Sequence, residues 1–192
     1  MREPLMSMQN QNPALFPLLT TDRLVLRKLE IDDAGELLKL RSDESVNKYL
    51  ERPKSRTINE VIEFINKIQA GISKNESFYW AISLKNESKL IGTICLWNLD
   101  KENSRAEVGY ELLPAYQGKG LMQEALSKII ECGFQILGFK TITAYTDSAN
   151  ERSVRILEKN NFRRDKALEY EYFQKEGFGN EVIYSLKSTT IE

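Results

Sequence analysis

Three kinds of residue in this chain could take part in chemistry: glycines around a lysine, a serine near a helix start, and carboxylates on predicted strands. The glycines lie in PAYQGKGLMQEAL, where Gly118 and Gly120 precede an amphipathic helix. No usual N-cap residue stands just before that helix, so its first backbone N–H groups lack a partner. Because a helix N-terminus also carries partial positive charge, the stretch predicts a phosphate site. The alternative is that the two glycines only form a turn.

Two familiar phosphate-binding motifs fit this stretch poorly. The pattern GxxxxGK[ST] is absent, because Gly120 and Leu121 follow Lys119 and no hydroxyl is present to hold magnesium. The dinucleotide fingerprint also fails, because a third glycine is missing and the preceding strand belongs to a meander. A nucleotide-binding enzyme that uses this loop therefore stays a minor alternative.

The chain contains no histidine, which excludes Ser/His/Asp and Cys/His nucleophile pairs and the common zinc sites. We expect no metal, and a general base must be Glu, Asp, Tyr, Lys or water. Glu107 shares one face of a predicted strand with Gly109 and Glu111, because side chains alternate along a strand. Glu169 and Glu171 form a second same-face pair if ALEYEYF is a strand. Each carboxylate could also be a solvated surface residue.

Two tyrosines of this region, Tyr110 and Tyr145, are expected to pack in the fold and not to act in chemistry.

Composition limits the class of protein. The 192 residues carry a net charge of −1, with a pI of about 5.8, which disfavours nucleic acid or an anionic membrane as partner. Cys95 and Cys132 lie in apolar runs and are expected to be buried thiols. No apolar run approaches the length of a membrane span, and the start lacks the order of a signal peptide. We therefore expect a cytoplasmic protein.

Hydrophobic periodicity predicts one domain over residues 21–192 after a flexible N-terminal arm of residues 1–20. Expected strands are 23–29, 78–84, 89–99, 105–113, 140–146, 167–173 and 181–186; expected helices are 31–42, 57–71, 118–137 and 150–161. Thr57 and Glu60 form a capping-box pattern at the start of the second helix. The order predicts an α+β fold: a mostly antiparallel sheet with a central strand-helix-strand crossover and helices on both faces.

The stretch QGKGLM, which follows AEVGYELLP, resembles the coenzyme A pyrophosphate loop of the GNAT acetyltransferase superfamily. That pattern is Q/R-x-x-G-x-G/A, matched here by Gln117 and Gly120, with Met122 in place of the last small residue. Residues 21–50 and the stretch NERSVRILEKNNF resemble the RimJ/RimL-like branch. The second has Asn161 where the branch usually has Gly, and Asn also suits a left-handed helix end. The resemblance covers roughly residues 20 to 186.

This resemblance implies transfer of an acetyl group from acetyl-CoA to an amine. It implies a GNAT-type mixed sheet in which two central strands, 105–113 and 140–146, splay apart around the pantetheine arm. Backbone groups of Leu112 and Leu113 would bind the pantetheine amides. The diphosphate would be held by backbone amides of the loop, namely Gln117, Gly118, Lys119, Gly120, Leu121 and Met122. Asn150 would reach the cofactor arm, although simple N-capping is an equal alternative.

The catalytic groups are less well marked. Many relatives use a tyrosine on the helix after the central strand to protonate the leaving thiolate, but Ile156 and Leu157 stand there in this chain. Ser153 is the replacement candidate, because a hydroxyl can donate a hydrogen bond to sulfur. Its alternative is a short polar residue in a first helical turn. Glu107 and Glu171 are the candidate bases that could accept the proton of the amine.

The acceptor follows from the acidity of amines. An α-amine with a pKa near 7.7 is roughly 40% neutral at pH 7.5, whereas lysine is about 0.1% neutral, a difference of roughly 3.7 kcal/mol. An N-terminal α-amine of a protein or peptide is therefore the expected acceptor, in agreement with the RimJ/RimL-like resemblance. Small amines such as antibiotics or polyamines, and an acyl-CoA-binding module without transfer activity, remain alternatives. The sequence also leaves a homodimer open.

Overall fold

The computed structural model describes residues 16–50, 52–176 and 179–189. Its strands are β1 (Leu19–Thr20), β2 (Leu24–Lys28), β3 (Phe78–Leu84), β4 (Leu90–Asp100), β5 (Arg105–Leu112), β6 (Thr141–Asp147), β7 (Arg163–Arg164) and β8 (Glu181–Lys187). Its α-helices are α1 (Ala34–Ser42), α2 (Glu44–Asn47), α3 (Ile58–Ser73), α4 (Leu121–Glu131), α5 (Glu151–Lys159) and α6 (Lys166–Glu176). Short 3₁₀ turns (Ile31–Asp33 and Pro114–Tyr116) precede α1 and α4, and a π-helical turn (Cys132–Ile136) extends α4.

The eight strands form one sheet in the order β1-β2-β3-β4-β5-β6-β8-β7. All neighbours are antiparallel except β5 and β6, which are parallel and joined through α4. The predicted α+β class, the meander and the central crossover are therefore confirmed.

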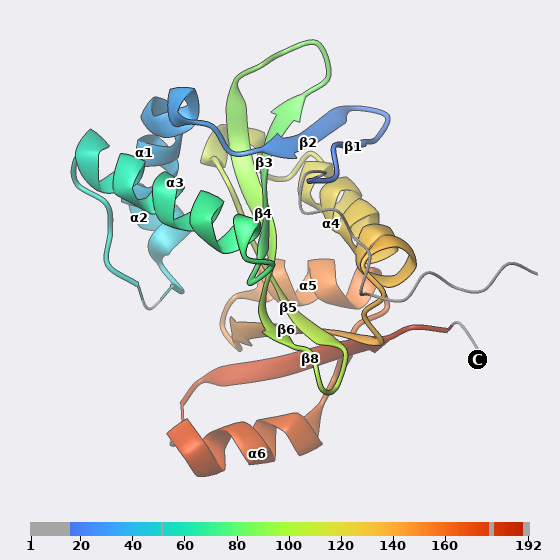
Figure 1. Cartoon of the computed structure of the whole chain (residues 1–192). Helices are drawn as coiled ribbons and strands as arrows, with labels where there is room; N and C mark the ends of the chain where they lie inside the picture. Colours follow the sequence, from blue (N-terminus) through green and yellow to red (C-terminus); the bar gives the residue numbers. More distant parts are fainter. Residues whose placement is uncertain (1–15, 51, 177–178, 190–192) are drawn as a thin grey trace, which may run out of the picture.

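Helices cover both faces of the sheet (Figure 1). One face carries α1 and α3, whose apolar side chains pack with those of β3 and β4, for example Leu37, Val61 and Ile65 against Tyr79 and Ala81. The other face carries α4 and α5, which enclose the larger core around the fully buried Trp80 and Phe162. Periodic apolar residues on α3 and α4 explain why each helix buries one side.

The predicted N-terminal arm divides into two parts. Residues 1–15 lie outside the described residues. Residues 16–20 pack on the domain, because Leu19 and Thr20 pair with β2 and the ring centroid of Phe16 lies 5.1 Å from that of Trp80. The Trp80 indole N–H also donates to the carbonyl of Pro17 at 2.8 Å.

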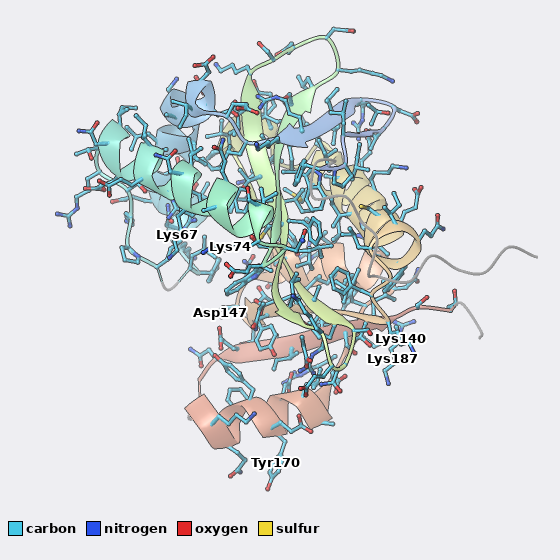
Figure 2. The ribbon with its side chains drawn as sticks, in the orientation of Figure 1. Lys67, Lys74, Lys140, Asp147, Tyr170 and Lys187 are labelled. Carbon is cyan, nitrogen blue, oxygen red and sulfur yellow. The ribbon has the colours of Figure 1, made fainter. Side chains whose placement is uncertain are left out.

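One predicted strand, residues 167–173, is wrong, because these residues belong to helix α6. The Asp165 side chain accepts a hydrogen bond from the Leu168 N–H, and its carbonyl accepts one from Glu169. Asp165 therefore caps a helix rich in Lys, Ala, Leu, Glu and Gln. The alternating tyrosines that favoured a strand lie on different sides of α6: Tyr172 packs edge-on against Tyr145 of β6, and Tyr170 points away from the molecule (Figure 2).

Strands β5 and β6 separate beyond their first residues. They pair only from Arg105 opposite Thr141 to Glu107 opposite Thr143. Beyond that point β5 continues to Leu112 along β4, while β6 stays paired with β8 as far as Asp147. The result is an opening between two central strands, which we call the split.

Candidate active site

The backbone of β5 presents polar groups to the split. The Leu113 N–H donates to the Ile91 carbonyl at 2.9 Å, so this residue faces β4. Because the direction of backbone groups alternates along a strand, Leu112 and Tyr110 face the split. The Leu112 carbonyl accepts from Gln117 Nε2 at 2.8 Å. Of the two predicted pantetheine contacts, Leu112 is well placed, whereas the N–H of Leu113 is already used within the sheet.

The loop after β5 leaves backbone amides open. Gly118 and Gly120 both have a φ of +74°, and Gly120 is the N-cap of α4 with no side-chain capping bond. Such a backbone suits glycine, since other residues pay steric strain there. No described residue accepts a hydrogen bond from the amides of Lys119, Leu121 or Met122. The Gln117 amide differs from the prediction, because it donates to the Pro114 carbonyl at 3.1 Å.

Three cationic side chains surround this loop. Arg23, in the turn before β2, donates to the Lys119 carbonyl at 2.9 Å and pairs with Glu124 of α4. Arg152 of α5 donates to Gln117 Oε1 at 2.8 Å. Together with Lys119, these arginines form a positively charged rim around the loop, which would favour the binding of an anionic phosphate. Sequence reasoning missed Arg23 and Arg152, because both reach the loop from distant segments.

A hydroxyl pair bridges the split on the α4 and α5 face. Tyr110 of β5 and Ser153 of α5 are joined by a 2.8 Å hydrogen bond between their oxygens. Burial raises the pKa of Tyr110 to about 12, so the phenol keeps its proton at neutral pH. The predicted candidate Ser153 thus lies at the split, and Tyr110, expected only to pack, joins it there. Asn150 caps α5 by accepting from the Ser153 N–H at 3.3 Å.

Glu107 lies at the point where β5 and β6 part. Burial is the main cause that raises its pKa to about 7, and the negative charge of Glu181 adds to the effect. Asn98 Nδ2 donates to Glu107 Oε2 at 3.2 Å and moderates the shift. A carboxyl with a pKa near neutrality can accept and release a proton under ordinary conditions. Glu107 is therefore the strongest candidate base among the described carboxylates.

The other carboxylates are committed to contacts or exposed. Glu111 is bound by both terminal nitrogens of Arg52, with Nη1 at 2.8 Å from Oε1. Glu169 accepts from Arg164 and from the Ile183 N–H. Glu171 does not share a face with Glu169, because residues two apart on a helix point in different directions. It is exposed on α6, beside a small hollow lined by Tyr145 and Tyr172.

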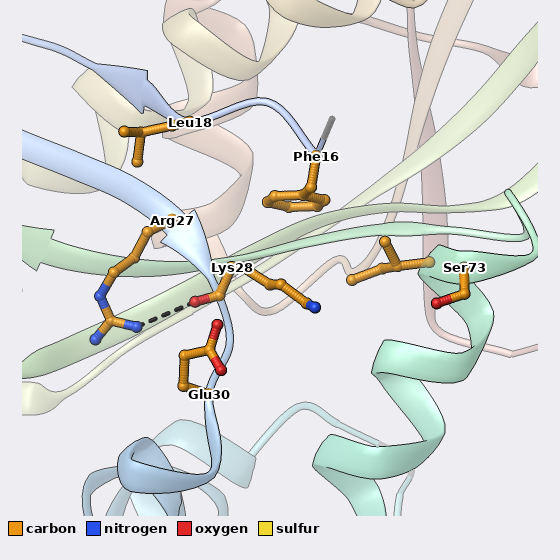
Figure 3. A pocket seen from close by; sticks show the side chains of 7 residues that line it. Phe16, Leu18, Arg27, Lys28, Glu30 and Ser73 are labelled. Atoms are coloured by element: carbon orange, nitrogen blue, oxygen red, sulfur yellow. Dashed lines mark hydrogen bonds between the residues drawn. The ribbon is translucent and has the colours of Figure 1, made fainter. Parts of the chain in front are cut away.

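A second hollow lies away from the split, near the edge of the sheet formed by β1 and β2. It is lined by residues of β2, by Phe16 and Leu18, and by the end of α3 (Figure 3). Arg27 there donates to the Lys28 carbonyl at 3.1 Å. None of the candidate catalytic residues lines it. The candidate residues Glu107 and Ser153, with Tyr110, lie at the split instead.

In the described part of the chain, no three His, Cys, Asp or Glu residues gather as metal ligands. No described helix is long and apolar enough to cross a membrane.

Comparison with known proteins decides the family. Residues 23–163 match the family described as an acetyltransferase (GNAT) domain. The chain belongs to the GNAT acetyltransferase family. This GNAT protein is 31% identical over 172 residues to the uncharacterized N-acetyltransferase YoaA of Bacillus subtilis, covering 90% of this chain and 97% of YoaA. It is therefore an acetyl-CoA-dependent N-acetyltransferase.

Solved GNAT structures share the fold. A GNAT acetyltransferase from Bacillus anthracis superposes with a TM-score of 0.72 at 25% identity, over 89% of this chain and 98% of that one. RimL, the ribosomal L7/L12 α-N-protein acetyltransferase solved with coenzyme A, gives a TM-score of 0.74 at 18% identity, over 90% and 97%. The expected GNAT-type sheet is thus confirmed.

Relatives differ in the acceptors that their names state. YdaF of Bacillus subtilis, provisionally named a ribosomal N-acetyltransferase, is 28% identical over 185 residues, covering 88% of this GNAT chain and 93% of YdaF. Spermidine N(1)-acetyltransferase of Escherichia coli is 25% identical over 158 residues, covering 82% of each chain. The family therefore fixes the acetyl transfer but leaves the acceptor to be inferred from the site.

Proposed function

We propose that this acetyltransferase modifies the α-amine of a peptide or protein N-terminus. The observation that carries the proposal is the position of Glu107, half-buried at the inner end of the split, where burial raises its pKa to about 7. An α-amine titrates near 7.7, so Glu107 is closely matched to it. A lysine or polyamine amine, which titrates near 10.4, would hold its proton against such a base.

The donor would lie in the split. The open amides of Lys119 to Met122 and the rim formed by Arg23, Lys119 and Arg152 would hold the diphosphate. The polar backbone groups of Tyr110 and Leu112 that face the split would bind the pantetheine arm in the manner of a neighbouring strand. Asn150, besides capping α5, lies at the end of the split where its side chain could contact that arm.

The reaction would then use groups on both faces of the sheet, which meet at the split. Glu107, acting directly or through a water, takes a proton from the acceptor ammonium, and the neutral nitrogen attacks the thioester carbonyl carbon. The attacking nitrogen then carries an extra proton. When the carbon–sulfur bond breaks, the Tyr110–Ser153 pair gives a hydroxyl proton to the departing thiolate and regains one from this nitrogen through water, while Glu107 releases the first proton to solvent. The products are the amide and coenzyme A. Glu171 has no part in this scheme, because α6 holds it exposed to solvent.

A panel of acceptors tests the proposal. A peptide with a free α-amine, the same peptide with a blocked N-terminus and one lysine, and spermidine would be incubated with acetyl-CoA, and thiol release and product mass would be followed. We expect the free α-amine to react at least about tenfold faster, because the other amines are mostly protonated. Faster reaction of spermidine would assign the site to small amines. Binding of acetyl-CoA without thiol release for any amine would favour a non-catalytic module.

A further inference from the structure

A cluster of two arginines lies on the α1 and α3 face of the sheet, beside the outer end of β5. Arg52 binds Glu111 through both terminal nitrogens and also donates to Asn47 Oδ1. The Asn47 amide in turn donates to the Arg41 carbonyl at 3.0 Å. The network therefore ties Arg41 of α1 to Glu111 of β5, on the strand face that also carries Glu107.

Arg41 has donors to spare. Its Nε donates to the buried Ser55 Oγ at 3.0 Å, and its guanidinium carbon lies over the Phe64 ring, 3.9 Å from the ring centroid. Within the described part of the chain, nothing accepts a hydrogen bond from its two terminal nitrogens. Burial, together with the positive charge of Arg52, lowers the pKa of Arg41. A packed, fixed guanidinium with unused donors is suited to a planar anion.

Among the described residues, the charges of this cluster do not balance. Arg41 and Arg52 contribute two positive charges, and Glu111 supplies one negative charge. Counted over the described residues, the cluster keeps one positive charge on Arg41, which is half-buried over Phe64 beside the Arg52–Glu111 pair, whose side chains are 22% and 12% exposed. Such a charge costs free energy unless an anion joins it.

The position of the cluster relative to Glu107 sets the length of a matching acceptor. Glu107 and Glu111 point from the same face of β5 with Gly109 between them, and the space above Gly109 is bordered by Cys95 Sγ and Trp97 Nε1, 3.2 and 3.7 Å from where its Cβ would be. Strand residues rise about 3.3 Å each, so Glu111, the β5 residue that binds Arg52, lies about 7 Å from Gly109 and about 13 Å from Glu107. An extended peptide spans the same distance in two to four residues.

We propose that Arg41, supported by Arg52, binds a carboxylate on the acceptor, so that the preferred substrates are N-terminal peptides with an acidic second residue. This inference rests on the proposed function, since it assumes that the acceptor amine meets the donor near Glu107 and Gly109. It excludes polyamines as preferred acceptors, because a cationic chain would be repelled by the cluster.

Matched peptides test the preference. Three C-terminally amidated pentapeptides would differ only at the second residue, Asp, Asn or Lys, so that the aspartate side chain supplies the one carboxylate. We expect kcat/KM for the Asp peptide to exceed that for the Asn peptide by about tenfold or more, through KM, because charge-assisted hydrogen bonds are strong. The Lys peptide should be the poorest. Equal values for Asp and Asn would overturn the proposal.

Variants of two cationic residues on α1 test whether Arg41 causes the preference for the Asp peptide. In Arg41→Gln the Asp/Asn ratio of kcat/KM should fall about tenfold, towards one. Lys39→Gln is the matched control, because it removes from the same helix an exposed cation whose only ion pair among the described residues is with Glu36. That control should keep the ratio. A ratio unchanged in Arg41→Gln, with the fold intact by circular dichroism, would overturn the assignment; if this variant does not fold, the peptide series on the unchanged protein still decides the preference.

A binding experiment distinguishes a failure of this inference from a failure of the proposed function. The same peptides would be titrated calorimetrically into the protein saturated with coenzyme A, which needs no turnover. Tighter binding of the Asp peptide without thiol release would support the carboxylate site while contradicting peptide acetylation. Thiol release from all three peptides at equal rates, with equal affinities, would contradict the carboxylate site while supporting acetylation.

Discussion

At the scale of single residues, Glu107 is the group whose environment differs most from that of an ordinary surface carboxylate. Burial raises its pKa to about 7, and Glu181 and the partly exposed Trp97 lie around it. Its backbone pairs with both neighbouring strands, to Trp97 on β4 and Thr143 on β6, so the side chain is fixed where the split begins. Its place in the sheet thus makes Glu107 a suitable base.

The activity of the protein should titrate with Glu107. Because the base must lose its proton, kcat should rise with pH and level off above about 7. Glu107→Gln should lower kcat by about a hundredfold and remove this titration. The measurement is kcat against pH at saturating acetyl-CoA and peptide. The same rise at the same pH in Glu107→Gln would show that another group is the base.

The free energy of unfolding should also depend on the ionisation of Glu107, but it should fall with rising pH where kcat rises. The pKa of Glu107 is higher in the folded protein than its ordinary value of 4.5, so the folded state binds more protons between about 4.5 and 7. The free energy of unfolding contributed by this group therefore falls as pH rises through that interval. Glu107→Gln should lack this fall, which urea unfolding at several pH values would measure. An equal fall in both proteins would contradict the assignment.

Sequence reasoning found Glu107 by strand alternation but could not tell its environment. The sequence places Glu107, Gly109 and Glu111 on one face, and the structure confirms this arrangement. The same pattern cannot say that Arg52 forms an ion pair with Glu111, whereas Glu107 has no cationic partner among the described residues, because that depends on a loop distant in the chain. The arginine cluster around Arg41 was missed for the same reason.

At the scale of elements, the hydrogen bond between Tyr110 and Ser153 joins β5 to α5 across the split. The hydroxyl pair is held at 2.8 Å because α5 is fixed at both ends. Asn150 caps its start, and Asn161, with a φ of +65°, closes its end while the Phe162 N–H donates to the Leu157 carbonyl. This is a Schellman ending with asparagine in place of glycine, as the sequence predicts.

Removing either hydroxyl should slow the departure of the thiolate. Ser153→Ala and Tyr110→Phe should each lower kcat about tenfold and leave the affinity for coenzyme A nearly unchanged, because the bond acts on the leaving sulfur. The double variant should cost little more than the worse single variant, because the two hydroxyls act as a unit. Single-turnover kinetics would measure these effects.

A matched control is available on the same helix pair. Ser127→Ala removes another hydroxyl bond between α4 and α5, from Ser127 Oγ to Asn160 Oδ1 at 2.8 Å, away from the split. It should lower the melting temperature without changing kcat. If Ser153→Ala matched this control, with a loss of stability and unchanged turnover, Ser153 would be only a residue of the first helical turn.

The elements themselves were predictable to different degrees. Long periodic segments such as α3 and α4 were predicted correctly, because one apolar side of a helix repeats clearly. Helix α6 was mistaken for a strand because Leu168, Tyr170 and Tyr172 alternate with glutamates. The stronger signal was Asp165, whose side chain caps the helix. Capping residues should therefore outweigh alternation in a short segment.

At the scale of the whole molecule, the inner end of the split carries the carboxyl group of Glu107, and its outer end is surrounded by cationic side chains. The loop between β5 and α4 is surrounded by Arg23, Lys119 and Arg152. The opposite face of the sheet carries Glu107 at the inner end and the arginine cluster at the outer end of β5. Donor and acceptor would therefore approach from opposite faces and meet at the split. The net charge of −1 conceals this arrangement, because it averages over both faces.

The central claim is that the loop at the start of α4 binds the diphosphate of coenzyme A, and calorimetric titration tests it most directly. Coenzyme A and ATP would be titrated into the unchanged protein and into Gly120→Asn. Asparagine tolerates the left-handed backbone, and its Cβ would meet only Arg23 Nη2 at 3.5 Å, so the fold should persist. The larger side chain should crowd the open amides.

We predict that coenzyme A binds the unchanged protein more tightly than ATP does, and that Gly120→Asn weakens its binding about tenfold or more while lowering the melting temperature only slightly. Equal affinity of the folded variant and the unchanged protein for coenzyme A would contradict the account, because the glycines would then form only a turn.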